Sequence, residues 1–169
     1  MIKIFGAKGN IQNVDSFLDK IIKYRKEKEL IIQAFNADVI YDKEHLISAF
    51  NHAERSFKNK TNSTNSLEME ILLYSSGERQ LKLAIPKMGV ISGNSNVAFI
   101  FIKDKTMLTD SIIFEFLEYV SLKRDDKVLL GNVDTLKKFG IKKNEIQTVT
   151  KDKYGHLILE KIALLDIIK

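Results

Sequence analysis

The residues best suited to chemistry in this sequence surround a short polar turn, Ser75-Ser76-Gly77-Glu78-Arg79. We predict that a helix ends at Gly77, because glycine readily takes the left-handed conformation that terminates helices, and that a second short helix begins at Glu78. The free backbone N–H groups at the start of a helix, together with its dipole, favour an anion. An arginine in that first turn, here Arg79, can hold a phosphate through two parallel hydrogen bonds. The turn therefore predicts a site for a phosphate group.

Neighbouring side chains add polar, aromatic and basic groups to this predicted site. Ser76 supplies a hydroxyl, Gly77 lets a backbone approach closely, and Tyr74 offers a ring on which a nucleobase can stack. The full set of candidate nucleic-acid-binding residues is Tyr74, Ser76, Gly77, Arg79, Gln80, Lys82, Lys58 and Lys60. The last two end the preceding predicted helix, where they would extend the positive surface. The alternative is a helical hairpin whose polar turn simply faces water, and the residues alone leave both interpretations open.

Few side chains in the sequence are suited to catalysis. There is no cysteine, so disulfides, zinc–thiolate sites and thiol chemistry are excluded, and the three histidines include His45 and His52 two helical turns apart. No carboxylate on the same face completes a metal triad, so we predict structural or surface roles for both and no bound metal or cofactor. Neither a Walker phosphate loop nor a dinucleotide fingerprint occurs. A non-enzymatic protein is predicted, with a small enzyme built on Asp, Glu and Lys as the alternative.

A second short motif, Gly6-Ala7-Lys8-Gly9, matches the pattern that clamps nucleic-acid backbones in KH domains. In that fold the motif joins two helices, whereas here it follows a predicted strand at 2–5. We therefore predict an ordinary turn at this motif.

Length and composition indicate one domain spanning residues 1–169. The hydrophobic fraction of 44% is sufficient for a core, and the net charge of +5 with a pI near 9.2 is compatible with a polyanionic partner. No apolar run approaches the roughly 20 residues that span a bilayer. Lys3 and Lys8 interrupt any signal-peptide pattern, so no membrane contact and a cytoplasmic location are predicted.

Hydrophobic periodicity predicts an α+β fold, a single domain with a mixed or mostly antiparallel sheet packed with several helices. The predicted strands are 2–5, 30–35, 96–102 and 127–130. The predicted helices are 14–22, 43–60, 65–75, a short one from 78, 110–120, 132–139 and 157–168. Asp42 is expected to cap the second helix, Asn65 with Glu68 to form a capping box, and Gly140 to end the helix at 132–139.

The predicted C-terminal helix at 157–168 is apolar around most of its circumference. A surface helix keeps one apolar stripe, so the additional apolar side chains either enter the core or cover a partner. Ile158, Ile162 and Leu165 are our candidates for contacts with a partner protein. A charge at these positions should disrupt a complex if they face the partner, and should unfold the isolated chain if they belong to the core.

The segment 65–82, NSLEMEILLYSSGERQLK, also resembles the signature of a known family. It is similar to the small KEOPS subunit known in animals as the PRPK-binding protein. A second stretch, Gln33-Ala34-Phe35-Asn36-Ala37-Asp38 followed by Glu44-His45-Leu46, supports the likeness, as do the glycine-stopped helix and apolar helix near the C-terminus. Pro86 departs from the family pattern and predicts that the second helix of the hairpin breaks near Pro86 and Gly89, which leaves the place of Lys87 open.

The resemblance implies an accessory role rather than catalysis. Such subunits belong to the KEOPS complex, which makes threonylcarbamoyladenosine in tRNA. They bind its small atypical kinase/ATPase directly and contact the other KEOPS subunits only indirectly, and they recruit tRNA through its single-stranded 3′ CCA end. We accordingly expect a kinase-binding, tRNA-binding accessory subunit. The alternative is a protein-interaction module that regulates the kinase without touching RNA.

Overall fold

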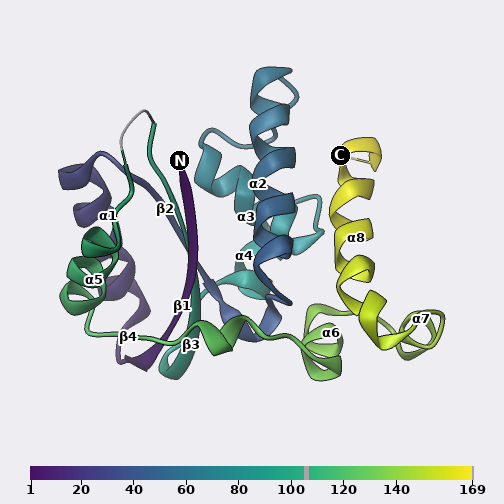
Figure 1. The fold of residues 1–169 in the computed structure, drawn as a ribbon. Coiled ribbons are helices and arrows are strands. Elements are labelled where there is room, and N and C mark those ends of the chain that lie inside the picture. The colour runs from purple at the N-terminus through teal and green to yellow at the C-terminus, as the bar shows by residue number, and fades with distance from the viewer. Residues whose placement is uncertain (105–106, 169) are drawn as a thin grey trace.

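The computed structural model describes residues 1–104 and 107–168 and is built around a four-stranded antiparallel sheet (Figure 1). The strands are β1 (Ile2–Ile11), β2 (Ile31–Asn36), β3 (Gly93–Ile102) and β4 (Lys123–Arg124), in the order β2-β3-β1-β4. Every neighbouring pair is antiparallel. The predicted α+β class is confirmed.

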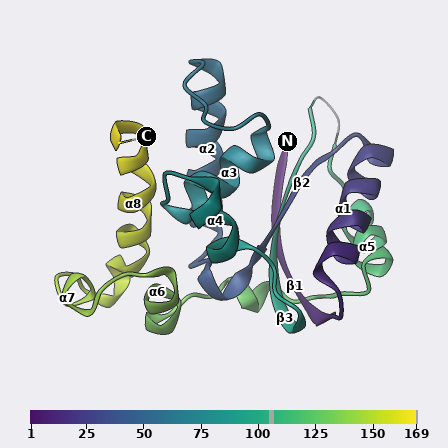
Figure 2. The same cartoon turned by 180° about the vertical axis from the view of Figure 1, so that it is seen from behind.

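Helices cover both faces of the sheet (Figures 1 and 2). One face carries α1 (Val14–Lys28) and α5 (Asp110–Tyr119), and the other carries α2 (Lys43–Lys58), α3 (Leu67–Ser76) and α4 (Leu81–Met88). Beyond α2 lie α6 (Val133–Phe139), α7 (Lys143–Ile146) and α8 (Tyr154–Ile168). No helix within the described ranges combines the length and hydrophobicity needed to cross a membrane.

The alternation of side chains along β3 explains why there are two cores. Val97, Phe99 and Phe101 enter the core beneath α1 and α5, whereas Ala98 and Ile100 enter the core beneath α2 and α3. Successive residues of a strand point to opposite faces, and all five are buried because both faces are covered. Such a strand appears in the sequence as a continuous apolar run, which is why 96–102 was recognisable.

Several element boundaries agree with the predictions. Asp42 caps α2 by accepting the His45 N–H at 2.9 Å, and Gly140 ends α6 with φ of 107°. The predicted capping box at Asn65 and Glu68 is wrong, because Ser66 is the residue that caps α3. α4 runs through Pro86 to Met88, so the predicted break lies only at Gly89.

Two predictions near β1 are wrong for a common reason. The segment 127–130 is not a strand, since Asp126–Leu129 forms a 3-10 turn, and the motif Gly6-Ala7-Lys8-Gly9 is not a turn but lies inside β1. The segment after β4 crosses β1 at very short range. A Cβ atom on Gly6 would lie 2.5 Å from the Asp125 carbonyl oxygen. Glycine is therefore needed here for close packing and not for a reversal of the chain.

His45 is a buried structural residue, as predicted. Its Nε2–H donates to the Ser75 carbonyl oxygen at 2.7 Å, and its Nδ1 accepts the Tyr41 N–H at 3.2 Å. This pattern requires the neutral ring. Burial lowers the pKa of His45 from 6.5 to about 4, and Lys87 adds to the decrease while Ser75 and Asp42 oppose it. The ring thus fastens the start of α2 to the end of α3.

Acid should weaken the fold through His45. Its pKa is lower in the folded chain than in the unfolded chain, so the unfolded chain binds the extra proton first as the pH falls. The stabilisation is complete above pH 6.5 and is lost between pH 6.5 and about 4, up to roughly 3 kcal/mol. Guanidinium unfolding across this range measures the loss, and NMR titration of the ring identifies its source. A ring that titrates in the folded chain near pH 6.5 would contradict the assignment.

Candidate nucleic-acid and partner interface

The turn between α3 and α4 differs from the sequence prediction in its second half. Gly77 ends α3 with φ of 67°, as predicted. α4 begins at Leu81, however, and not at Glu78. The Ser76 hydroxyl accepts the Glu78 N–H at 2.9 Å, and the Glu78 carboxylate pairs with Lys87 Nζ at 3.2 Å, so these contacts hold 77–80 in an irregular loop. Arg79 therefore lies on this loop and not in the first helical turn.

The loop leaves three of the predicted residues in solvent. Arg79, Gln80 and Lys82 are exposed, and Arg79 forms no ion pair with any residue in the part of the chain that the structure describes. The Gln80 carbonyl oxygen accepts the Leu83 N–H, but among the described residues no side chain caps the Leu81 and Lys82 N–H groups at the start of α4. These three residues form a polar, positively charged edge, called here the Arg79 loop.

Two other predicted residues, both in the last turn of α3, are buried. Tyr74 is 1% exposed, its ring lies 5.4 Å from that of His52, and its hydroxyl donates to Asp166 at 2.7 Å. Ser76 is fully buried and donates to the Leu73 carbonyl oxygen at 2.6 Å. The predicted stacking role of Tyr74 and the predicted ligand contact of Ser76 are therefore wrong, because both side chains are used inside the fold.

Lys87 has a role that the sequence did not reveal. Its ammonium donates to the Ser76 carbonyl oxygen at 2.6 Å and lies 3.9 Å from the centre of the Phe139 ring. It caps the end of α3, where the helix dipole favours a cation. Burial lowers its pKa, against the opposing effect of Glu78. Gly77 is half-buried beside it and opens onto a cavity of about 180 Å³ toward α6 and α8.

Lys58 and Lys60 do not adjoin the Arg79 loop. Ser56 of α2 bonds Glu70 of α3, whereas His45 of α2 bonds Ser75, so the two helices run antiparallel. Lys58 lies 58 − 45 = 13 residues beyond His45, a helical distance of roughly 20 Å. The predicted continuous positive surface through these lysines is wrong. Lys58 instead pairs with Glu54 at 3.0 Å on its own helix.

The three partner candidates on α8 belong to the core. Ile158, Ile162 and Leu165 are fully buried against the rest of the chain, which answers the question that the sequence left open. The apolar side chains that α8 exposes are Leu164, Ile167 and Ile168, at 41%, 80% and 47%. We call these three residues the α8 patch. They are apolar, lie in the last two turns, and are the part of α8 that a partner could cover.

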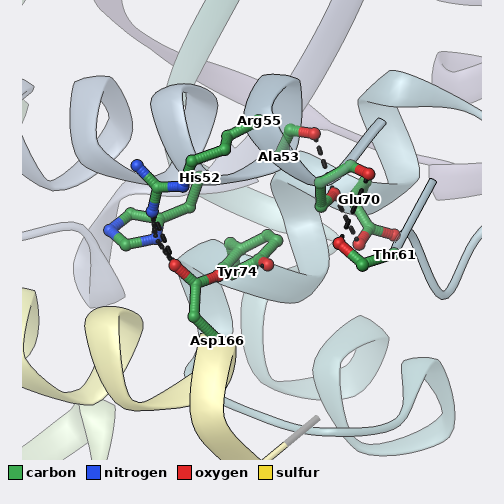
Figure 3. Close-up of polar contacts among 8 residues, drawn as sticks. His52, Ala53, Arg55, Thr61, Glu70, Tyr74 and Asp166 are labelled. Atoms are coloured by element: carbon green, nitrogen blue, oxygen red, sulfur yellow. Dashed lines mark hydrogen bonds and ion pairs between the residues drawn. The ribbon is translucent and has the colours of Figure 1, made fainter. Parts of the chain in front are cut away.

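An ionic cluster holds the last turn of α8 against α2 and α3 (Figure 3). Asp166 accepts hydrogen bonds from the Tyr74 hydroxyl at 2.7 Å and from Arg55 at 2.6 Å, and it lies 2.8 Å from His52 Nδ1. Partial burial by itself would raise the carboxyl pKa, but the contacts with these three side chains outweigh it and lower the pKa to about 2. An acidic residue at a helix C-terminus opposes the helix dipole, so the position is explained by these contacts.

The loop before α3 is held by another carboxylate that the sequence did not single out. Glu70 is fully buried and accepts the backbone N–H groups of Ser63 and Thr64 at 3.1 and 2.9 Å. Ser56 donates to the same carboxylate at 3.1 Å. No group of three or more potential metal ligands occurs in residues 1–104 and 107–168. The contacts of Glu70 tie the loop before α3 to the end of α2.

Comparison with known proteins identifies the family. The family model described as "Kinase binding protein CGI-121" matches residues 9–166. The chain belongs to this family. It is also 33% identical over 144 residues to the regulatory protein Cgi121 of Methanocaldococcus jannaschii, a match that covers 83% of this chain and 86% of that protein. The Arg79 loop lies within the matched region, as does Leu164 of the α8 patch.

The Asp166 carboxylate anchors α8 in this CGI-121 family member, and its removal should lower the stability of the fold. Asp166→Ala removes the carboxylate that contacts Tyr74, Arg55 and His52, and we expect the free energy of unfolding to fall by about 2 kcal/mol. Urea unfolding followed by circular dichroism measures the change. Glu160→Ala on the same helix is the matched control. Glu160 is exposed and forms no ion pair with any described residue, so this variant should change stability by less than about 0.5 kcal/mol. Equal effects of the two variants would contradict the anchor.

Proposed function

We propose that this chain is a non-catalytic accessory subunit of a KEOPS-type complex. In this role it binds the kinase/ATPase subunit and brings tRNA to the modification machinery by its 3′ CCA end. The family description names kinase binding, and the archaeal relative is named a regulatory protein, which supports the first half. The second half is carried by one observation: Arg79 is exposed, and pairs with no acidic residue that the structure describes, on a loop that also presents Gln80 and Lys82.

The Arg79 loop suits a single-stranded RNA end better than a duplex. It is short, so it offers few phosphate contacts, and its Arg fork and uncapped helix start both favour phosphate oxygens. Gln80 presents an amide that can donate to and accept from a base edge. Recognition of single strands usually adds stacking. Tyr74 does not supply it, so we assign the loop to the phosphates and base edges of the CCA end.

The α8 patch is the proposed kinase-facing surface. Leu164, Ile167 and Ile168 form an apolar end to a helix whose position is fixed by Asp166. Binding surfaces concentrate their energy in apolar side chains that are held in place before association. The patch and the Arg79 loop lie on different elements, so one partner can occupy each.

Trimming of the tRNA tests the RNA half of the proposal. Intact tRNA and the same tRNA without its CCA end are titrated against the protein at several salt concentrations. We expect trimming to weaken binding at least tenfold, and the logarithm of affinity to fall with that of salt by about 0.7 per phosphate contact. Equal affinity for both RNAs would assign binding to another surface.

The second candidate function is kinase regulation without RNA contact. The burial of Tyr74 and Ser76 favours it, because two of the groups expected to touch RNA are absent from the surface. Under this alternative neither tRNA binds the isolated protein, while the kinase complex forms normally. Pull-down of the purified kinase subunit, carried out alongside the RNA titration, separates the two functions.

A further inference from the structure

The free edge of the sheet lies at the floor of an apolar groove. The cavity has a volume of about 670 Å³ and runs between α1 and the α3–α4 pair, with β2 at its base. Leu18, Ile21 and Ile22 of α1 form one wall, and Met69, Leu72 and Ile85 form the other. Leu18, Ile22 and Ile85 are 39%, 41% and 48% exposed, so the rim is apolar as well.

The hydrogen-bond register shows which backbone groups point into this groove. Met1 and Lys103 exchange backbone hydrogen bonds, at 2.7 and 3.0 Å. Every second residue before Lys103, beginning with Phe101, therefore directs its backbone N–H and C=O groups to β1. The intervening β3 residues, including Ile100, bond to β2, where Ile100 pairs with Gln33. The backbone N–H and C=O groups of Gln33 therefore point to β3, and those of Ile32 and Ala34 point away from the sheet into the groove.

Most of these outward groups have no hydrogen-bond partner among the described protein atoms, and their residues are buried. Ile32 and Ala34 are 2% and 5% exposed. The Ala34 carbonyl accepts the Gln33 side-chain amide at 3.0 Å, but within residues 1–104 and 107–168 neither outward N–H group has an acceptor. A buried backbone N–H without a partner costs free energy, so almost all such groups are paired in native proteins. A row of carbonyl oxygens is the group that the groove floor is suited to accept.

The two walls indicate what side chains that partner carries. Residues of an added strand point alternately to the two faces of a sheet. One set would meet the α1 wall and the other the α3–α4 wall, and both walls are apolar. Arg25 is the last α1 residue that lines the groove and pairs with Glu68 in the first turn of α3, so the charged end of the groove is already neutralised. Such a lining does not suit a nucleic acid.

We propose that the β2 edge receives an extended, aliphatic segment of a partner protein by strand addition. The segment's carbonyl oxygens accept the Ile32 and Ala34 N–H groups, its own N–H groups replace the Gln33 side chain at the Ala34 carbonyl, and its alternate side chains fill the two halves of the groove. This inference is independent of the RNA and kinase assignments, because neither the Arg79 loop nor the α8 patch lines the groove.

Selection from a displayed library of random heptapeptides tests the proposal, with the wild-type chain and two variants as targets. Ala34→Pro removes one outward N–H without removing a bond to β3, a position at which an edge strand tolerates proline. Ile22→Asp places a charge on the α1 wall. Circular dichroism and amide NMR spectra check that both variants fold. Winning peptides are synthesised and titrated by calorimetry, each also with single backbone N-methyl groups.

We expect the winners to carry aliphatic residues, to shift the Ile32 and Ala34 amide resonances, and to bind wild type at least tenfold more tightly than either variant. N-methylation should abolish binding at the residues that face β2 and have little effect at the intervening ones. This pattern holds even if one variant fails to fold. Equal binding to a folded Ala34→Pro, insensitivity to N-methylation, or no enriched peptide would each overturn strand addition. A wild-type dimer that Ala34→Pro dissociates would overturn it in favour of self-pairing.

Discussion

Ile162→Asp is expected to unfold the isolated chain, with a loss of at least about 4 kcal/mol from the free energy of unfolding. Ile162 is fully buried in the core between α8 and the α2–α3 pair, where a carboxylate finds neither water nor a cation. Domains of this size are stable by only about 5–15 kcal/mol, so this single change removes a large share. Urea unfolding followed by circular dichroism measures the loss.

Ile167→Asp, on the same helix, is the matched control. Ile167 is 80% exposed, so the variant should keep its stability within about 0.5 kcal/mol. If the α8 patch faces the kinase, this variant should weaken the complex by about 2 kcal/mol, or roughly 30-fold, measured by calorimetry with the purified kinase subunit. A stable variant with unchanged kinase affinity would move the kinase-binding surface to another part of the molecule. A stable Ile162→Asp chain would contradict the packing of α8 itself.

Arg79→Glu should abolish most tRNA binding while leaving the fold intact. The change removes a phosphate contact and places a negative charge against the RNA backbone, for which we expect a loss of at least tenfold at moderate salt. The exposed Arg79 has no ion pair among the described residues, so stability should change by less than about 0.5 kcal/mol. Filter binding of tRNA across a salt series measures the affinity, and the difference should shrink as salt increases.

Lys123→Glu provides the control for charge alone. Lys123 is exposed on β4, at the opposite side of the sheet from α4 (Figure 1), and the variant has the same net charge as Arg79→Glu. A specific contact predicts a much larger loss at Arg79 than at Lys123. Equal losses would mean that tRNA responds only to the overall positive charge, and the proposed role of the Arg79 loop would then be abandoned.

Local patterns in the sequence were sufficient where one short segment decides its own conformation. Gly77 and Gly140 end helices because the left-handed conformation favours glycine, and Asp42 caps α2 through its own backbone neighbours. The apolar run of β3 predicted a strand. Such signals depend on residues only a few positions apart, so no knowledge of the rest of the fold is required.

The start of α4 shows where local patterns fail. Glu78 follows a helix stop and has the composition of a first turn, yet Lys87 and the Ser76 hydroxyl hold it in a loop. The glycines of β1 likewise resembled a turn, although they allow close packing inside a strand. Residues 125–128 pack against Gly6, and Ser121 and Leu122 pack against Gly9. Both errors arose from contacts that a local pattern does not contain. The β1 glycines meet residues distant in sequence, and Glu78 is held by the direction of two side chains.

The sequence by itself determined the family, the α+β class and the residues from which the candidate surfaces are built. Only the tertiary structure decided which of these residues are accessible. Tyr74 and Ile162 carry groups that suit binding, but packing against α8 and α2 buries them, and Arg79 remains outside because the loop projects beyond that packing. Burial of a residue depends on which helices and strands pack together. This packing is set by contacts throughout the chain, and no single segment encodes it.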